Sequence, residues 1–72
     1  MVEVFKTNVK DREHAAILLA MIQKEFADYA VNFDLEDCDR ILRIECNSGH
    51  IQAPVIIDLL EDFGVEADIL EA

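Results

Sequence analysis

The chain has 72 residues, sixteen of them acidic and six basic, so its formal charge is −10 and most of its surface repels nucleic acid and anionic membranes. Its two cysteines cannot form a disulfide framework, and its longest apolar run, Ala15 to Ile22, is far shorter than the roughly 20 residues that cross a bilayer. Since the first residues do not form a basic-then-apolar leader either, we expect one reduced, cytoplasmic domain, residues 1–72, that is held together by packing.

A change of hydrophobic period separates the first two predicted elements. Val2 to Thr7 reads as a strand, and from about Asp11 the apolar residues recur at helical spacing. This pattern predicts an amphipathic helix to about Ala27, with Asn8 or Asp11 accepting hydrogen bonds from its first N–H groups. The predicted buried face consists of Ala15, Leu18, Leu19, Ile22 and Phe26.

A hairpin is predicted next. The residues from Tyr29 to Leu35 alternate between apolar and polar side chains, as do those from Ile41 to Cys46. Between them, Glu36 to Asp39 has the composition of a turn. The two strands should therefore pair, with one face of the hairpin buried.

The remaining residues predict a second helix and a last strand. The helix should begin near residues 51–53, with Pro54 in its first turn, and end at Gly64. Its predicted buried residues are Ile56, Leu59, Leu60 and Phe63. Val65 to Ile69 alternates as an edge strand protected by acidic residues. The order β-α-β-β-α-β predicts an α+β fold of the ferredoxin-like type, a four-stranded antiparallel sheet with two helices on one face.

Across nearly its whole length the chain resembles the heavy-metal-associated domain family of copper chaperones and metal-pump modules. The resemblance rests on the size, on the order of elements and on the segment Asp62-Phe63-Gly64-Val65-Glu66-Ala67, which is similar to the end of that family's second helix and its last strand. It implies the same fold for this chain. The family binds Cu(I) and other soft ions through the thiolates of a Met-x-Cys-x-x-Cys motif at the first strand-helix connection.

That metal motif is absent from this chain. When the first helices are matched, Val9 stands at the position of the methionine, and Asp11 and His14 stand at the positions of the cysteines. A shift of one residue places Lys10 and Glu13 there instead. Neither alignment gives a pair of soft ligands, so the resemblance implies the scaffold of the family without its activity.

A different kind of metal site is an alternative. Asp11 and His14 belong to the connection before the first helix, and Cys38 belongs to the hairpin turn at the same end of the predicted fold. Together they offer the oxygen, nitrogen and sulfur ligands that zinc accepts. The same residues also fit an ordinary helix start with a capping Asp11, an exposed His14 and a turn cysteine. We favour this structural interpretation and expect neither a metal nor another cofactor.

Catalytic chemistry is not indicated by the remaining candidates. Cys46 and His50 could form a ligand pair before the second helix, but a small buried cysteine beside a loop histidine explains them more simply. Cys38 lies among acidic residues, and neighbouring carboxylates disfavour the thiolate that a nucleophilic cysteine needs. His14 and His50 are expected at opposite ends of the fold, and no glycine-rich phosphate loop is present. We therefore expect no enzymatic activity.

Protein contact is the function that this sequence favours, and two surfaces could provide it. The first is the charged segment from Lys10 to His14, including Arg12, together with the predicted turn from Glu36 to Asp39. We expect it to bind a protein partner, or a second copy of the chain in a weak homodimer.

The second surface is the sheet face that carries no helix. If Val2 and Val4 point inward, Phe5 points outward, next to Ile41 or Arg43 on the neighbouring strand. A single aromatic residue and a large negative charge do not make a platform for stacking nucleic-acid bases. A small apolar patch for protein association around Phe5 and Arg43 is the expectation for this face.

Overall fold

The structure of the chain is a computed structural model that describes residues 1–36, 38–47 and 49–70. Its elements are β1 (Val2–Thr7), α1 (Arg12–Glu25), β2 (Tyr29–Asp34), β3 (Ile41–Cys46), α2 (Ala53–Glu61) and β4 (Ala67–Ile69). Asp37 of the predicted turn, Ser48 of the predicted loop and residues 71–72 of the predicted domain lie outside the described residues. The order and type of the elements confirm the predicted ferredoxin-like fold.

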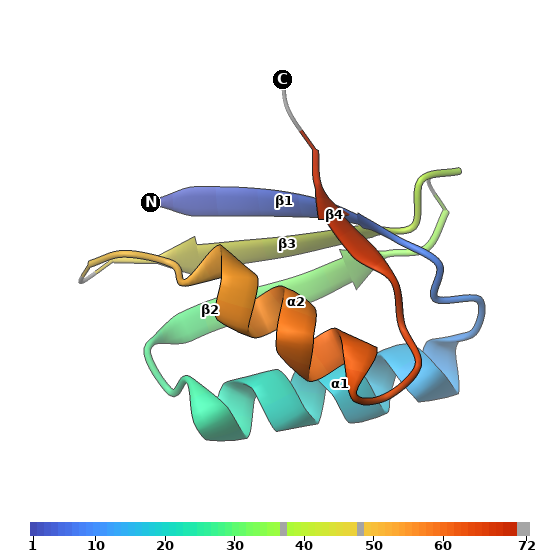
Figure 1. The fold of residues 1–72 in the computed structure, drawn as a ribbon, viewed down its shortest axis with the longest axis horizontal. Coiled ribbons are helices and arrows are strands. Elements are labelled where there is room, and N and C mark those ends of the chain that lie inside the picture. The colour runs from blue at the N-terminus through green and yellow to red at the C-terminus, as the bar shows by residue number, and fades with distance from the viewer. Residues whose placement is uncertain (37, 48, 71–72) are drawn as a thin grey trace.

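The four strands form one antiparallel sheet in the order β2-β3-β1-β4 (Figure 1). The central strand β3 pairs with β2 over the whole length of β2, from Tyr29 opposite Cys46 to Asp34 opposite Ile41. Consequently β2 and β4 are the edge strands. Both helices lie on the same face of the sheet and leave the other face uncovered.

One core fills the space between the helices and the sheet. The helices contribute Ala15, Leu18, Ile22, Ala53, Ile56 and Leu60, and the strands contribute Phe5, Tyr29, Leu42, Ile44, Cys46 and Ala67. The alternation in β3 is as predicted, since Leu42, Ile44 and Cys46 are buried and the residues between them are not. Cys46 is thus a buried core residue, which confirms the sequence interpretation.

The predicted orientation of β1 is wrong. Phe5 is fully buried in the core, whereas Val2 is 46% exposed and Val4 lies on the uncovered face. The pairing of the strands explains this result, because Phe5 lies opposite Leu42 and residues that are directly opposite share a face of the sheet.

The end of the second helix and the start of the last strand also differ from the prediction, since β4 begins at Ala67 and not at Val65. Helix α2 ends at Glu61, and Phe63 is 48% exposed rather than buried. The chain reverses at Gly64, which has a positive φ of 78°, and the N–H of Val65 then donates to the carbonyl of Leu60 at 3.0 Å. Val65 enters the core in place of Phe63.

Several predicted core positions lie at the margin of the core. Leu19, Phe26 and Leu59 are only partly buried, and Ile69 is exposed at the end of the short strand β4. Leu19 faces the space beside the edge strand β2, where less of the structure covers it.

Candidate functional site

The connection between β1 and α1 is anchored by hydrogen bonds. The side chain of Val9 is buried, and its N–H donates to the hydroxyl oxygen of Thr7 at 3.3 Å. The side-chain oxygen of Asn8 accepts from the N–H of Glu66 at 3.0 Å, and the N–H of Asn8 donates to the carbonyl of Glu66 at 3.3 Å. The segment that leads into α1 is therefore tied both to β1 and to the approach to β4.

Asp11 caps helix α1. Its carboxylate oxygen Oδ1 accepts a 2.7 Å hydrogen bond from the N–H of His14, and its backbone is extended, as an N-cap requires. Of the two residues predicted as possible caps, Asp11 has this role. Its carboxylate is thus held against the first turn of the helix.

The alternative zinc site is not assembled. Among the described residues, no three His, Cys, Asp or Glu side chains lie close enough together to hold a metal ion. Asp11, His14 and Cys38, all of which are described, are therefore not brought together as a three-ligand set. The capping of α1 by Asp11 gives a physical reason, because it directs the carboxylate at the backbone of His14. Cys38 is an exposed thiol on the hairpin connection.

The end of the hairpin is tied to β1. The hydroxyl of Thr7 donates to the carbonyl of Arg40 at 2.6 Å, and Nζ of Lys6 lies 3.7 Å from Oδ1 of Asp39. Arg40 has a positive φ of 50°, and its guanidinium Nη1 donates to the carbonyl of Leu35 at 3.1 Å. The connection before α1 and the hairpin connection thus lie at the same end of the molecule, as the fold predicts.

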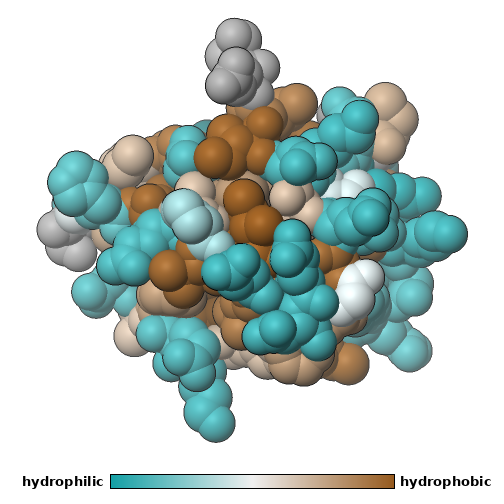
Figure 2. Space-filling model, viewed as in Figure 1, coloured by the Kyte–Doolittle hydropathy of each residue, from teal (hydrophilic) through white to brown (hydrophobic). Residues whose placement is uncertain are grey.

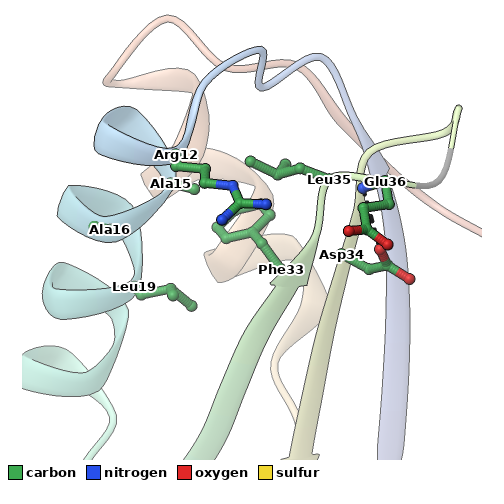
Figure 3. A pocket seen from close by; sticks show the side chains of 8 residues that line it. All are labelled: Arg12, Ala15, Ala16, Leu19, Phe33, Asp34, Leu35 and Glu36. Atoms are coloured by element: carbon green, nitrogen blue, oxygen red, sulfur yellow. Dashed lines mark hydrogen bonds between the residues drawn. The ribbon is translucent and has the colours of Figure 1, made fainter.

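A groove of about 400 Å³ lies between α1 and the end of β2 (Figure 3). We call it the α1–β2 groove. Its lining residues are Arg12, Ala15, Ala16 and Leu19 from the helix, and Phe33, Asp34, Leu35 and Glu36 from the end of β2 and the residues after it. The small side chains on the helix and the edge position of β2 leave this space unfilled, and Leu19, Phe33 and Leu35 remain partly exposed in it.

The charged residues of the groove are separated by side. Arg12 extends from the first turn of α1 across the groove toward Phe33, whereas Asp34 and Glu36 point away from the helix (Figure 3). Oδ1 of Asp34 accepts from the N–H of Glu36 at 3.2 Å. Within the described ranges, no ion pair is formed by Arg12, Asp34 or Glu36. The groove therefore has an apolar floor with one positive lip and one negative lip.

The sequence predicted part of this site. Arg12 and Glu36 were both candidates, and the structure brings them to the same groove; Lys10 is exposed at the neighbouring connection. Ala16 and Phe33 were not among the predicted site residues. The strand order of the structure places Phe33 on the edge strand β2, where an apolar residue has a neighbouring strand on one side only.

The uncovered sheet face is less apolar than predicted. Phe5 is absent from it, and the smaller Val2, Val4 and Ile41 are among its apolar residues. Arg43 is exposed there, as predicted, and its Nε lies 3.3 Å from Oε1 of Glu45. Half of each of these charged side chains is exposed, so this pair contributes little to stability.

In the part of the chain that the structure describes, no helix is both long enough and apolar enough to span a membrane. Figure 2 shows apolar and hydrophilic side chains interspersed over the helix-bearing face. Comparison of the chain with models of protein families, with curated proteins and with solved structures gives no significant match. The structure itself shows the fold. What the chain shares with heavy-metal-associated domains is this topology.

Proposed function

We propose that this domain acts by protein contact through the α1–β2 groove, without catalysis. The observation that carries the proposal is the groove itself, where partly exposed apolar side chains of α1 and β2 face a space that no described residue fills. An apolar floor with a polar rim is the usual composition of a protein-binding surface. A partner that covers the groove would remove this apolar surface from water.

The groove is a better candidate than the uncovered sheet face. Phe5, the aromatic residue expected on that face, lies in the core, and Arg43 has its own partner in Glu45. In contrast, the charges of Arg12, Asp34 and Glu36 are exposed and available to a partner. A charged rim around an apolar floor gives a partner both contact area and orientation.

We also propose that the chain is a relative of the heavy-metal-associated domains that retains the scaffold and lacks the soft-metal site. The shared topology supports this relationship, as does the burial of Val9 at the position of the family's motif methionine. Asp11 and His14 stand at the positions of the cysteines, and Asp11 serves as a helix cap. This arrangement supports a contact function in place of metal transfer.

The experiment that tests the contact function uses two matched substitutions on α1. Ala16 lines the groove, whereas Ala20 is exposed one turn further along the helix and lies outside it. Glutamine is a good helix former, so Ala16→Gln fills part of the groove at little cost to the helix, and Ala20→Gln is the control. Proteins captured by the immobilised wild-type domain would be identified, purified and measured against all three forms.

The proposal predicts that Ala16→Gln weakens a purified partner's binding about tenfold or more, a difference of about 1.4 kcal/mol, while Ala20→Gln leaves it unchanged. If both variants are folded and bind the partner as tightly as the wild type does, the groove is not the contact surface. Loss of binding in both would point to another part of α1.

A further inference from the structure

The exposed edge of β2 runs beside the α1–β2 groove. In an antiparallel pair, both backbone polar groups of one residue point to the same side of the strand, and successive residues point to alternate sides. The hydrogen bonds of Tyr29 show to which side of β2 the backbone groups of each residue point. Its carbonyl accepts from Nε2 of Gln23 on α1 at 3.0 Å, and its N–H donates to the carbonyl of Phe26 at 3.0 Å. The backbone polar groups of Tyr29 therefore point away from β3.

The same alternation fixes the other residues of β2. Ala30 and Asn32 direct their backbone groups to β3, and Val31 and Phe33 direct theirs to the open edge. No described group pairs with the N–H or the carbonyl of Val31 or Phe33. The open edge thus presents two N–H groups and two carbonyls in the spacing that another strand would match.

Side chains of the chain itself donate to backbone carbonyls before and after this stretch. At one end, Gln23 covers the carbonyl of Tyr29. Beyond the other end, Arg40 covers the carbonyl of Leu35. The stretch between them is about the length over which a short extended peptide pairs with an edge strand.

The two sides of the edge differ in chemistry. On the side of α1, a bound strand would meet the apolar floor formed by Leu19 and Phe33, with Arg12 above it. On the opposite side, it would meet the exposed carboxylates of Asp34 and Glu36. Because side chains alternate along a strand, a complementary segment would alternate between apolar and basic residues.

Charge also distinguishes a foreign segment from a second copy of this chain. Each copy has a formal charge of −10, and Asp34 flanks the edge in each. Charged residues beside an edge strand oppose pairing with a like-charged edge, and they favour a basic one. Arg43, the basic residue opposite Asn32 on β3, already pairs with Glu45.

We infer that the edge of β2 receives an extended segment of a partner protein as an added strand, with its apolar side chains in the α1–β2 groove and its lysine or arginine side chains toward Asp34 and Glu36. This inference rests on the proposed function and adds to it the mode of contact and the chemical class of the partner. Backbone pairing with Val31 and Phe33 supplies affinity, and the alternation of side chains supplies specificity.

The test uses a short synthetic peptide of alternating lysine and valine, blocked at both ends. Three control peptides share its length: one with the same residues in two separate blocks, one alternating glutamate and valine, and one with methylated backbone nitrogens. On the side of the chain, Asp34→Asn with Glu36→Gln removes the carboxylates beside the edge. Asp58→Asn with Glu61→Gln makes the same change of charge at exposed positions of α2.

The expected result is saturable one-to-one binding of the alternating peptide, with slower hydrogen exchange at the amides of Val31 and Phe33. Each control peptide should bind the wild-type domain about tenfold more weakly. The Asp34/Glu36 variant should bind the alternating peptide about tenfold more weakly, and the Asp58/Glu61 variant should bind it as the wild type does. No binding, or equal binding of the methylated peptide, would overturn the inference. Protection of the two amides by a dimer in the peptide-free protein would overturn it as well.

The outcome also separates this inference from the proposed function. If a purified partner protein is sensitive to Ala16→Gln but the alternating peptide does not bind, contact through the groove stands and strand addition fails. If neither the partner nor the peptide responds to changes at the groove, both fail.

Discussion

The phenol oxygen of Tyr29, the first residue of β2, accepts a 3.1 Å hydrogen bond from the backbone N–H of Gln52, the N-cap residue of α2. The same hydroxyl donates to the carbonyl of His50 at 3.2 Å. No side-chain cap bond is formed at the start of α2, and the Tyr29 hydroxyl instead satisfies the backbone N–H of the N-cap residue. One side chain thus joins the edge strand to the second helix.

Tyr29→Phe should lower the free energy of unfolding by about 1–2 kcal/mol, because it leaves the N–H of Gln52 and the carbonyl of His50 without this partner. The stacking of this ring on Phe26, with centroids 4.8 Å apart, is retained in the variant. Urea denaturation followed by circular dichroism measures the difference. Tyr29→Leu, which removes the stacking as well, should be less stable still. Unchanged stability of Tyr29→Phe would mean that the hydroxyl does not support the start of α2.

Thr7 is the buried polar residue that joins β1 to the hairpin connection. Its hydroxyl donates to the carbonyl of Arg40 and accepts from the N–H of Val9. Thr7→Val preserves the shape of the side chain but removes both hydrogen bonds, so it should cost about 1–3 kcal/mol in denaturant unfolding. Thr7→Ser keeps the hydroxyl and should be more stable than Thr7→Val. The opposite ranking would contradict the assigned hydrogen bonds.

Arg12 and Lys24 lie in the first and last turns of α1, where the helix dipole acts on them in opposite directions. Arg12→Glu places an acidic residue near the positive end and should raise stability by about 0.3–1 kcal/mol; Lys24→Glu places one near the negative end and should lower it by a similar amount. The two variants have the same net charge, so general repulsion cancels in the comparison. Thermal unfolding at low and high salt measures both effects, which should shrink as salt is added. Equal shifts in the two variants would contradict this assignment.

Most of the fold could be predicted from the sequence because its periodicities are regular. The alternation from Ile41 to Cys46 and the apolar spacing from Ala15 to Ile22 identified buried faces that the structure confirms. The face of β1 was not predictable from alternation alone, since Val2 and Val4 alternate with Glu3 and Phe5 and either face contains apolar residues. The pairing of Phe5 with Leu42 decides which face of β1 is buried, and that pairing is set by tertiary structure.

The candidate site was predictable only in part. The charge of Arg12 and Glu36 was visible in the sequence, but the groove between them depends on how far α1 lies from β2, which no local pattern specifies. The left-handed backbone of Arg40 was also hidden, because glycine and asparagine are the usual residues in that conformation. Asp11 illustrates a different limit: the sequence allowed both a cap and a metal ligand, and the geometry assigns the cap.

The open edge of β2 beside the α1–β2 groove is best tested by amide hydrogen exchange of the peptide-free protein, measured residue by residue by NMR. We expect fast exchange at Val31 and Phe33, whose N–H groups point away from β3, and slow exchange at Ala30 and Asn32, whose N–H groups pair with it. Equally slow exchange at all four residues in a protein that sediments as a monomer would contradict the open edge and the proposals built on it.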